Sequence, residues 1–120
     1  MKIGLCAWSF TGAHRETNQK LDPFIPEDLA QMAIERGLQS IECSPTPLEQ
    51  KTAAELAEFV EFLSRHQLDI ILDTGSANYH EDIVPLRETL EMAHRVGATV
   101  IRTTISNVLE GDRRIWGLQG

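Results

Sequence analysis

The sequence predicts an α/β fold built from parallel βα units, within a single domain that covers residues 1–120. Four short runs with strand character begin near residues 2, 39, 68 and 99, and this interval of roughly 30 residues is the size of a βα unit. Segments with helical periodicity lie between them. The composition, with 42% hydrophobic and 24% charged residues in a chain of 120, is typical of a globular domain.

The four strand-like runs are mostly apolar. We expect strands over residues 2–8 (KIGLCAW), 39–43 (QSIEC), 68–73 (LDIILD) and 99–105 (TVIRTTI). Strands that are apolar along most of their length favour a sheet that is covered on both faces, as parallel sheets are.

The first helix is predicted over residues 26–37 (PEDLAQMAIERG). Pro26 suits the first helical position, and Glu27 and Asp28 favour the positive end of the helix dipole. Gly37 ends the helix. The predicted buried stripe consists of Leu29, Met32 and Ala33.

The second helix has two candidate starts, because two capping boxes precede its apolar stripe. The sequences TPLE at 46–49 and TAAE at 52–55 each place a hydroxyl three residues before a carboxylate. The predicted buried side chains of this helix are Leu56, Phe59, Val60 and Leu63. The third helix covers residues 84–97, and its predicted buried side chains are Leu86, Leu90, Ala93 and Val96.

The alternation of strands and helices implies parallel strands joined by right-handed crossovers, in either a doubly wound sheet or a barrel. A doubly wound nucleotide-binding sheet places a glycine-rich turn after its first strand. Here that turn has one glycine, Gly12, and the connection to the first helix runs about fifteen residues, which is long for a βα loop. Because long βα loops form the active-site face of barrels, the sequence favours a barrel.

The two-residue period of a strand separates the two faces of the sheet. In the first strand the predicted helix-facing residues are Ile3, Leu5 and Ala7, and the opposite face carries Gly4, Cys6 and Trp8. In the later strands the predicted helix-facing residues are Ile41, Leu72 and Ile101. The residues then left for the opposite face, near the carboxyl ends of the strands, are Glu42, Asp73 and Arg102.

Three strands thus carry a charge on the face turned away from the helices. A charge within a buried parallel strand is costly unless it is paired or solvated. We interpret Glu42, Asp73 and Arg102 as the lining of a polar pocket at the top of the sheet. The alternative is an ion-pair cluster in which Arg102 bridges the two carboxylates for structural reasons alone.

Charge and cysteine content exclude several classes of protein. The net charge of −7 and the pI near 5.0 oppose binding to nucleic acid. The apolar run at the N-terminus is too short for the core of a signal peptide or for a membrane span, so we expect a cytoplasmic protein without a membrane partner. Cys6 and Cys43 fit neither a disulfide framework nor a zinc site, and we interpret them as small buried apolar residues.

Four segments resemble, in their order and spacing, the xylose isomerase-like superfamily of sugar phosphate isomerases and epimerases, which also includes endonuclease IV. They are MKIGLCAWSF (1–10), MAIERGLQSIECSP (32–45), LDIILDTG (68–75) and AHRVGATVIRTT (93–104). Members are (β/α)8 TIM barrels of about twice this length. The resemblance implies the N-terminal half of such a barrel, with about four strands and three helices, and an end at the start of the fourth helix near RRIWGLQG (113–120).

The resemblance also implies that the full-length protein is a metal-dependent isomerase or epimerase of a sugar or sugar phosphate. In such enzymes Mn or Mg is held by carboxylates and a histidine on the later strands, so we assign no metal ligand and no catalytic residue to this chain. We expect no metal bound to it and no activity from the 120 residues alone. The residues expected to bind substrate are Trp8, Glu42, Asp73, Arg102 and the loop residue His14.

The other histidines are interpreted as structural or exposed. His66 and His94 lie near predicted helix C-termini, where an imidazolium suits the helix dipole. His80 follows the third strand, a region in which endonuclease IV-like members hold a metal. It comes seven residues after Asp73 and directly before a helix, so capping or solvent exposure is favoured.

Two other functions stay open. A shortened βα domain could bind a small molecule or a partner, or oligomerise, without turnover; with open edges at the first and fourth strands, we expect a homo-oligomer. An endonuclease IV-like hydrolase is disfavoured by the acidic charge and by the lack of histidines at strand ends. A gene that continues in frame past Gly120 with a further strand ending in Glu would favour the enzyme.

Overall fold

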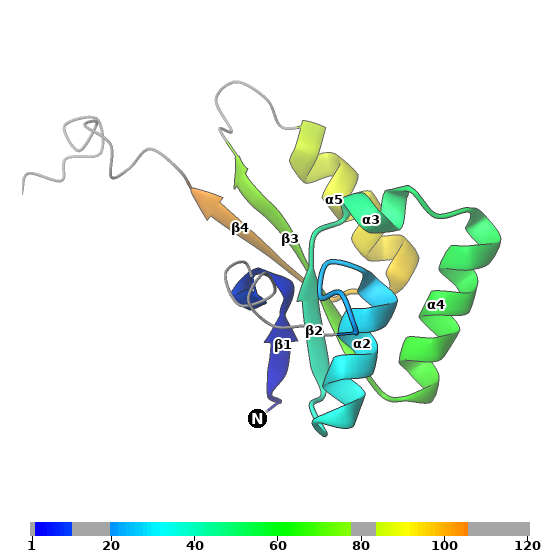
Figure 1. Ribbon diagram of the computed structural model, residues 1–120. Helices are drawn as coiled ribbons and strands as arrows, with labels where there is room; N and C mark the ends of the chain where they lie inside the picture. Colours follow the sequence, from blue (N-terminus) through cyan, green and yellow to red (C-terminus); the bar gives the residue numbers. More distant parts are fainter. Residues whose placement is uncertain (1, 11–19, 78–83, 106–120) are drawn as a thin grey trace, which may run out of the picture.

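A parallel four-stranded sheet forms the centre of the computed structural model, which describes residues 2–10, 20–77 and 84–105 (Figure 1). The strand order is β1-β2-β3-β4, and every neighbouring pair is parallel. The strands are β1 (Gly4–Cys6), β2 (Ser40–Cys43), β3 (Asp69–Ala77) and β4 (Val100–Ile105). The four predicted parallel strands are confirmed.

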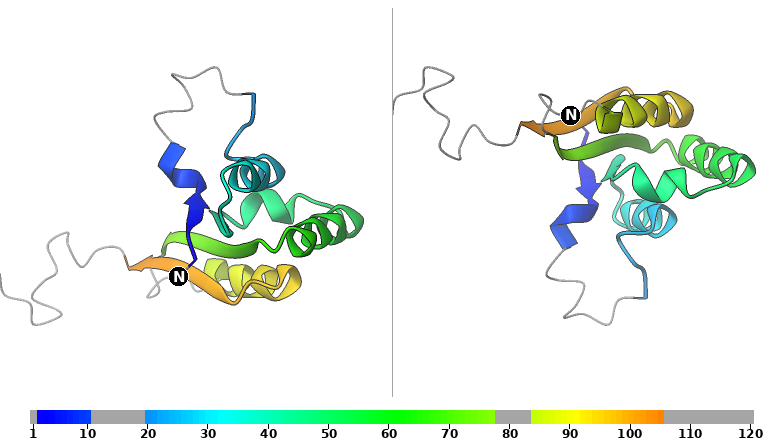
Figure 2. Two further views of the ribbon diagram at one scale, coloured as in Figure 1. Left: turned by 90° about the horizontal axis from the view of Figure 1, so that it is seen from below. Right: turned by 90° about the horizontal axis from the view of Figure 1, so that it is seen from above.

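The long helices lie along one side of this sheet (Figure 2). The helical elements are the 3-10 helix η1 (Ala7–Phe10), α2 (Pro26–Glu35), the single turn α3 (Thr46–Glu49), α4 (Ala53–Arg65) and α5 (Val84–Val96). The three crossover helices α2, α4 and α5 correspond to the three predicted ones.

Strand order and helix placement together decide between the two architectures that the sequence left open. A doubly wound sheet reverses its strand order and carries helices on both faces, whereas a barrel adds strands in one direction and keeps its helices outside. Here the order runs in one direction, and α2, α4 and α5 share one side (Figures 1 and 2). The chain therefore has the predicted α/β half-barrel architecture.

The start of α4 resolves the choice between the two capping boxes. Thr52 is the N-cap of α4, and its Oγ1 accepts a hydrogen bond of 3.1 Å from the backbone N–H of Glu55. The sequence TPLE forms only the short α3, whose N-cap is Pro45 and which has no side-chain capping bond. The box at 52–55 therefore starts the long helix.

Glycines end two of the three crossover helices. Gly37 follows α2 with φ of +66°, and Gly97 follows α5 with φ of +75°. This left-handed conformation is favourable for glycine and strained for residues that carry a Cβ. Both glycines thus act as the stop signals that the sequence predicts. After α4, Gln67 adopts the same conformation with φ of 55°.

The core lies between the sheet and the helices. Ile41 and Leu72 are fully buried there, as predicted for helix-facing strand residues. The helices contribute most of the remaining buried side chains, among them Leu29, Met32, Ala33, Leu56, Phe59, Leu63, Met92, Ala93 and Val96.

The predicted buried stripe of α5 is wrong at Leu90, which is exposed. Thr89 is buried in its place, and its hydroxyl donates a hydrogen bond of 2.9 Å to the backbone carbonyl of Pro85. A threonine that satisfies its hydroxyl within its own helix can be buried like an apolar residue. A pattern of apolar residues alone misses this face of α5.

The first strand is shorter than residues 2–8, and the third is longer than residues 68–73. Ile3 precedes β1 and is exposed, so it does not belong to the buried side chains of the helix-facing side. The chain turns into η1 after Cys6, which takes Trp8 out of the sheet. β3 continues to Ala77, with a register shift against β4 after Asp73.

Candidate functional site

The register of the sheet brings three charged residues together on one face, near the carboxyl end of β2. Glu42 in β2 lies opposite Cys6 in β1, and Asp73 in β3 lies opposite Arg102 in β4. Asp73 also lies two residues after the β3 partner of Glu42. Residues paired across a sheet, and residues two apart in a strand, share a face. Glu42, Asp73 and Arg102 therefore share the face opposite the helices, as the sequence predicts.

Arg102 binds both carboxylates. Its Nη2 donates to Oδ2 of Asp73 over 2.7 Å, and its Nε donates to Oε1 of Glu42. The side chain of Asp73 is 6% exposed and that of Glu42 18% exposed, while that of Arg102 is 51% exposed. Hydrogen bonds between charged groups are stronger than those between neutral groups. We call these three residues the Arg102 cluster.

The charges of the cluster keep its guanidinium protonated. The hydrogen bond that Arg102 donates to Glu42 and the charges of Glu42 and Asp73 raise the pKa of Arg102 further above its already high value. A guanidinium has five N–H donors, and the two bonds to the carboxylates use two of them. The half-exposed Arg102 can therefore offer further donors to a ligand on this face.

Both cysteines favour the neutral thiol. Burial raises the pKa of Cys6, and the neighbouring Glu42 carboxylate raises it further. Burial raises the pKa of Cys43 to about 12. Since a thiolate is the reactive form, neither residue is activated as a nucleophile. Cys43 is buried as predicted, whereas Cys6 is half-buried beside the Arg102 cluster.

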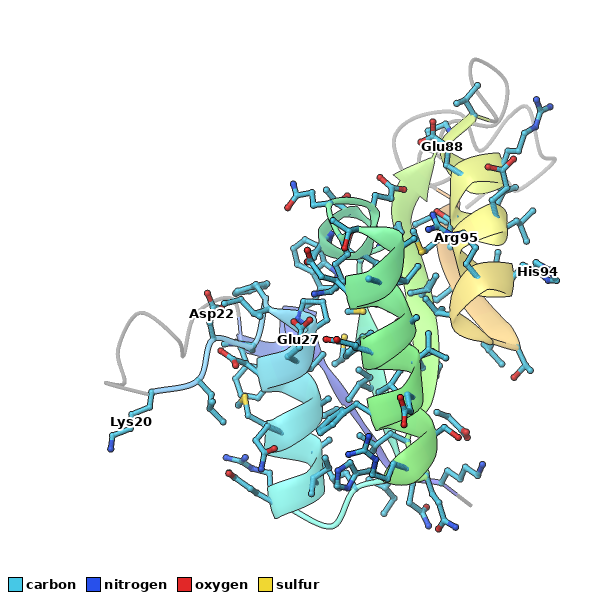
Figure 3. All side chains as sticks on the ribbon, turned by 90° about the vertical axis from the view of Figure 1, so that its right-hand side faces the viewer. Lys20, Asp22, Glu27, Glu88, His94 and Arg95 are labelled. Atoms are coloured by element: carbon cyan, nitrogen blue, oxygen red, sulfur yellow. The ribbon has the colours of Figure 1, made fainter. Side chains whose placement is uncertain are left out.

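Trp8 lies in η1, directly after β1, and the histidines lie at helix C-termini or outside the described residues. Trp8 is exposed in η1, and its ring meets that of Phe24 edge-on at 6.2 Å. His66 caps the C-terminus of α4, where its ring lies 4.5 Å from that of Phe62. His94 is exposed in the last turn of α5 (Figure 3). The predicted substrate-binding residue His14 and the weaker candidate His80 fall outside the described residues.

A hollow that the sequence does not predict lies between α2 and α4. This cavity of about 480 Å³ is lined by Leu21, Glu27, Asp28, Gln31, Lys51, Glu55, Glu58, Phe59 and Phe62. Lys51 pairs with Glu27 and lies 5.8 Å above the ring of Phe59 (Figure 3 shows Glu27 beside α4). Lys51 lies between two helices in the sequence, and no periodic pattern marks such a residue.

The described residues contain no group placed to bind a metal and no helix suited to span a membrane. Within residues 2–10, 20–77 and 84–105, no group of three or more His, Cys, Asp or Glu side chains is placed to hold a metal ion. Among the helices of that part of the chain, none combines the length and the apolar character of a membrane span.

Comparison of the chain with known protein families, with curated proteins and with solved structures finds no match. The functional proposal therefore depends on the geometry of the Arg102 cluster. Glu42, Asp73 and Arg102 come together on one face as the sequence predicts. Only Glu42 lies at the carboxyl end of its strand, because β3 and β4 continue past Asp73 and Arg102 to Ala77 and Ile105.

Proposed function

We propose that this chain supplies substrate-binding residues to a metal-dependent isomerase or epimerase of sugars or sugar phosphates. The supporting observation is the convergence of Glu42, Asp73 and Arg102 on one face of three neighbouring parallel strands, near the carboxyl end of β2. Barrel enzymes bind their substrates at this end of the sheet. The free cysteines agree with a reducing compartment, and we place the protein in the cytoplasm.

Arg102 is the main substrate-binding residue of this proposal. Its remaining N–H donors would bind hydroxyl or phosphate oxygens, since a guanidinium is a planar fork of donors. Glu42 and Asp73 hold that fork in place and can accept hydrogen bonds from sugar hydroxyls. These residues bind and orient the substrate, and none of them is given a catalytic step.

The divalent metal of such an enzyme does not fit the Arg102 cluster. The guanidinium already lies against both carboxylates, and a second cation there would be repelled by it. A metal polarises the substrate carbonyl in enzymes of this kind. Its ligands would therefore lie outside the cluster, and we expect the 120-residue chain alone to leave ketoses unchanged in a proton-exchange assay in heavy water.

Calorimetric titration with a panel of ketoses and ketose phosphates tests the proposed binding role. Arg102→Met should weaken binding at least tenfold, because the donor fork is lost. Arg65→Met is the matched control, since Arg65 also pairs with a carboxylate, Glu61, over 3.3 Å, but lies on α4. Absence of binding to the wild-type chain, or an equal loss in both variants, would contradict the proposal.

A non-catalytic module that binds or oligomerises is the second candidate, and one observation favours it. Arg102 is already paired with two carboxylates, as it would be in a cluster with a structural role alone. In that case Arg102→Met should lower the free energy of unfolding by about 1–2 kcal/mol, given the half-exposed guanidinium. A binding site also loses stability in Arg102→Met, because the buried Asp73 carboxylate loses its guanidinium. The structural role is therefore identified by this loss together with no saturable binding of ketoses to the wild-type chain.

A further inference from the structure

The two edges of the sheet are complementary to one another. In the described part of the chain, β1 pairs only with β2 and β4 pairs only with β3. The outer side of an edge strand presents backbone N–H and C=O groups that pair readily with another strand. Because all four strands run in the same direction, the outer side of β4 suits the outer side of β1 in parallel pairing.

The form of the sheet favours closure over extension. Strands are added in one direction, and the crossover helices lie on one side (Figure 2). Parallel sheets are normally covered on both faces, and a one-directional parallel sheet achieves this by closing into a barrel of eight strands. The described residues of one chain provide half of that number.

We propose that a second copy of this chain closes the sheet. β4 of each copy pairs in parallel with β1 of the other around a two-fold axis, so that two copies form an eight-stranded barrel with its helices outside. Each edge is used once and the assembly is closed, as a two-fold dimer requires. The barrel interior then contains two Arg102 clusters at the same end. This inference rests on the strand edges and not on the proposed function.

The charge distribution favours a contact between two copies at the edges of the sheet over a contact at the helices. Each copy has a net charge of −7, so two copies repel one another. The cavity between α2 and α4 is lined by four carboxylates, those of Glu27, Asp28, Glu55 and Glu58. A second copy docked there would bring like charges together. At the edges, contact is made by backbone groups and by exposed apolar residues, Ile3 beside β1 and Val100 in β4.

Sedimentation equilibrium of the 13.5 kDa chain tests the dimer. Lysine on an edge strand opposes strand pairing, so Ile3→Lys with Val100→Lys should raise the dissociation constant at least tenfold. Leu90→Lys is the matched control, because Leu90 is 51% exposed on α5 and Val100 is 52% exposed. Circular dichroism shows whether the variants are folded.

Backbone hydrogen exchange of the wild-type chain identifies the surface without any substitution. In the closed dimer, amides of β1 and β4 become more protected as the concentration rises. A wild-type chain that stays monomeric would overturn the proposal, and so would open-ended larger oligomers. A dimer that Leu90→Lys dissociates, or one whose new protection lies on the helices, would also overturn it.

Discussion

The Arg102 cluster carries a net negative charge. Two carboxylates meet one guanidinium there, which leaves the Arg102 cluster with one excess negative charge. Such a site repels a phosphate dianion more than it repels a neutral sugar. If the cluster binds substrate, we therefore expect neutral ketoses to bind more tightly than their phosphates.

The burial of the Cys43 thiol makes the stability of the folded chain depend on pH in the alkaline range. Burial raises the pKa of its thiol from 9.0 to about 12, so the folded chain holds the neutral form. Since the folded value lies above the unfolded one, this contribution to stability is complete below about pH 9 and is lost as the pH rises towards 12. The free energy of unfolding should fall by an additional amount of about 1.4 kcal/mol per pH unit in this range.

Urea unfolding at a series of alkaline pH values measures that slope. Cys43→Ala is the control, because it lacks the thiol but retains the other groups that titrate at high pH. The wild-type slope should exceed the slope of Cys43→Ala. Equal slopes in the two chains would show that the thiol titrates in the same way in the folded and unfolded states.

The sequence predicts the Arg102 cluster because strand periodicity is a local property. Glu42, Asp73 and Arg102 each follow a helix-facing apolar residue, and that order determines their face. Trp8 could not be placed in this way. The chain leaves the strand after Cys6, and the ring then contacts Phe24, which belongs to a distant part of the sequence. Contacts of that kind depend on tertiary packing, which a strand period does not describe.

At the scale of the element, helix ends are predicted better than buried faces. Gly37 and Gly97 mark helix ends that the structure confirms. These ends are predictable because glycine is the residue that adopts a positive φ without strain. The face of α5 is predicted less well, since Thr89 replaces Leu90 in the core. A pattern of apolar residues does not predict the burial of a polar residue whose hydroxyl bonds within its own helix.

The capping box of α4 gives the element-scale prediction. Thr52→Ala removes the hydrogen bond from the Glu55 N–H to Oγ1 and should lower the free energy of unfolding by about 1 kcal/mol. Thr46→Ala, in the other box, should have an effect below about 0.5 kcal/mol, because α3 has no side-chain capping bond. Urea unfolding of both variants measures the difference. Equal losses would mean that the hydroxyl of Thr52 does not stabilise the start of α4.

At the scale of the molecule, spacing predicts the architecture. Strand-like runs at intervals of roughly 30 residues require parallel crossovers, and the structure confirms a parallel sheet of order β1-β2-β3-β4. Spacing alone does not separate a barrel from a doubly wound sheet, because both are made from the same βα units. Strand order and the shared side of the helices separate them, and both are properties of the assembled sheet (Figures 1 and 2).

The central claim is that ligands bind at the Arg102 cluster, on the face of the sheet opposite the helices. The most direct measurement is the change in backbone amide NMR shifts when a neutral ketose is added. The account predicts saturable changes at Glu42, Asp73 and Arg102 that are lost in Arg102→Met. Shifts confined to the cavity between α2 and α4, around Lys51, would contradict it. The absence of any saturable shift would contradict it as well.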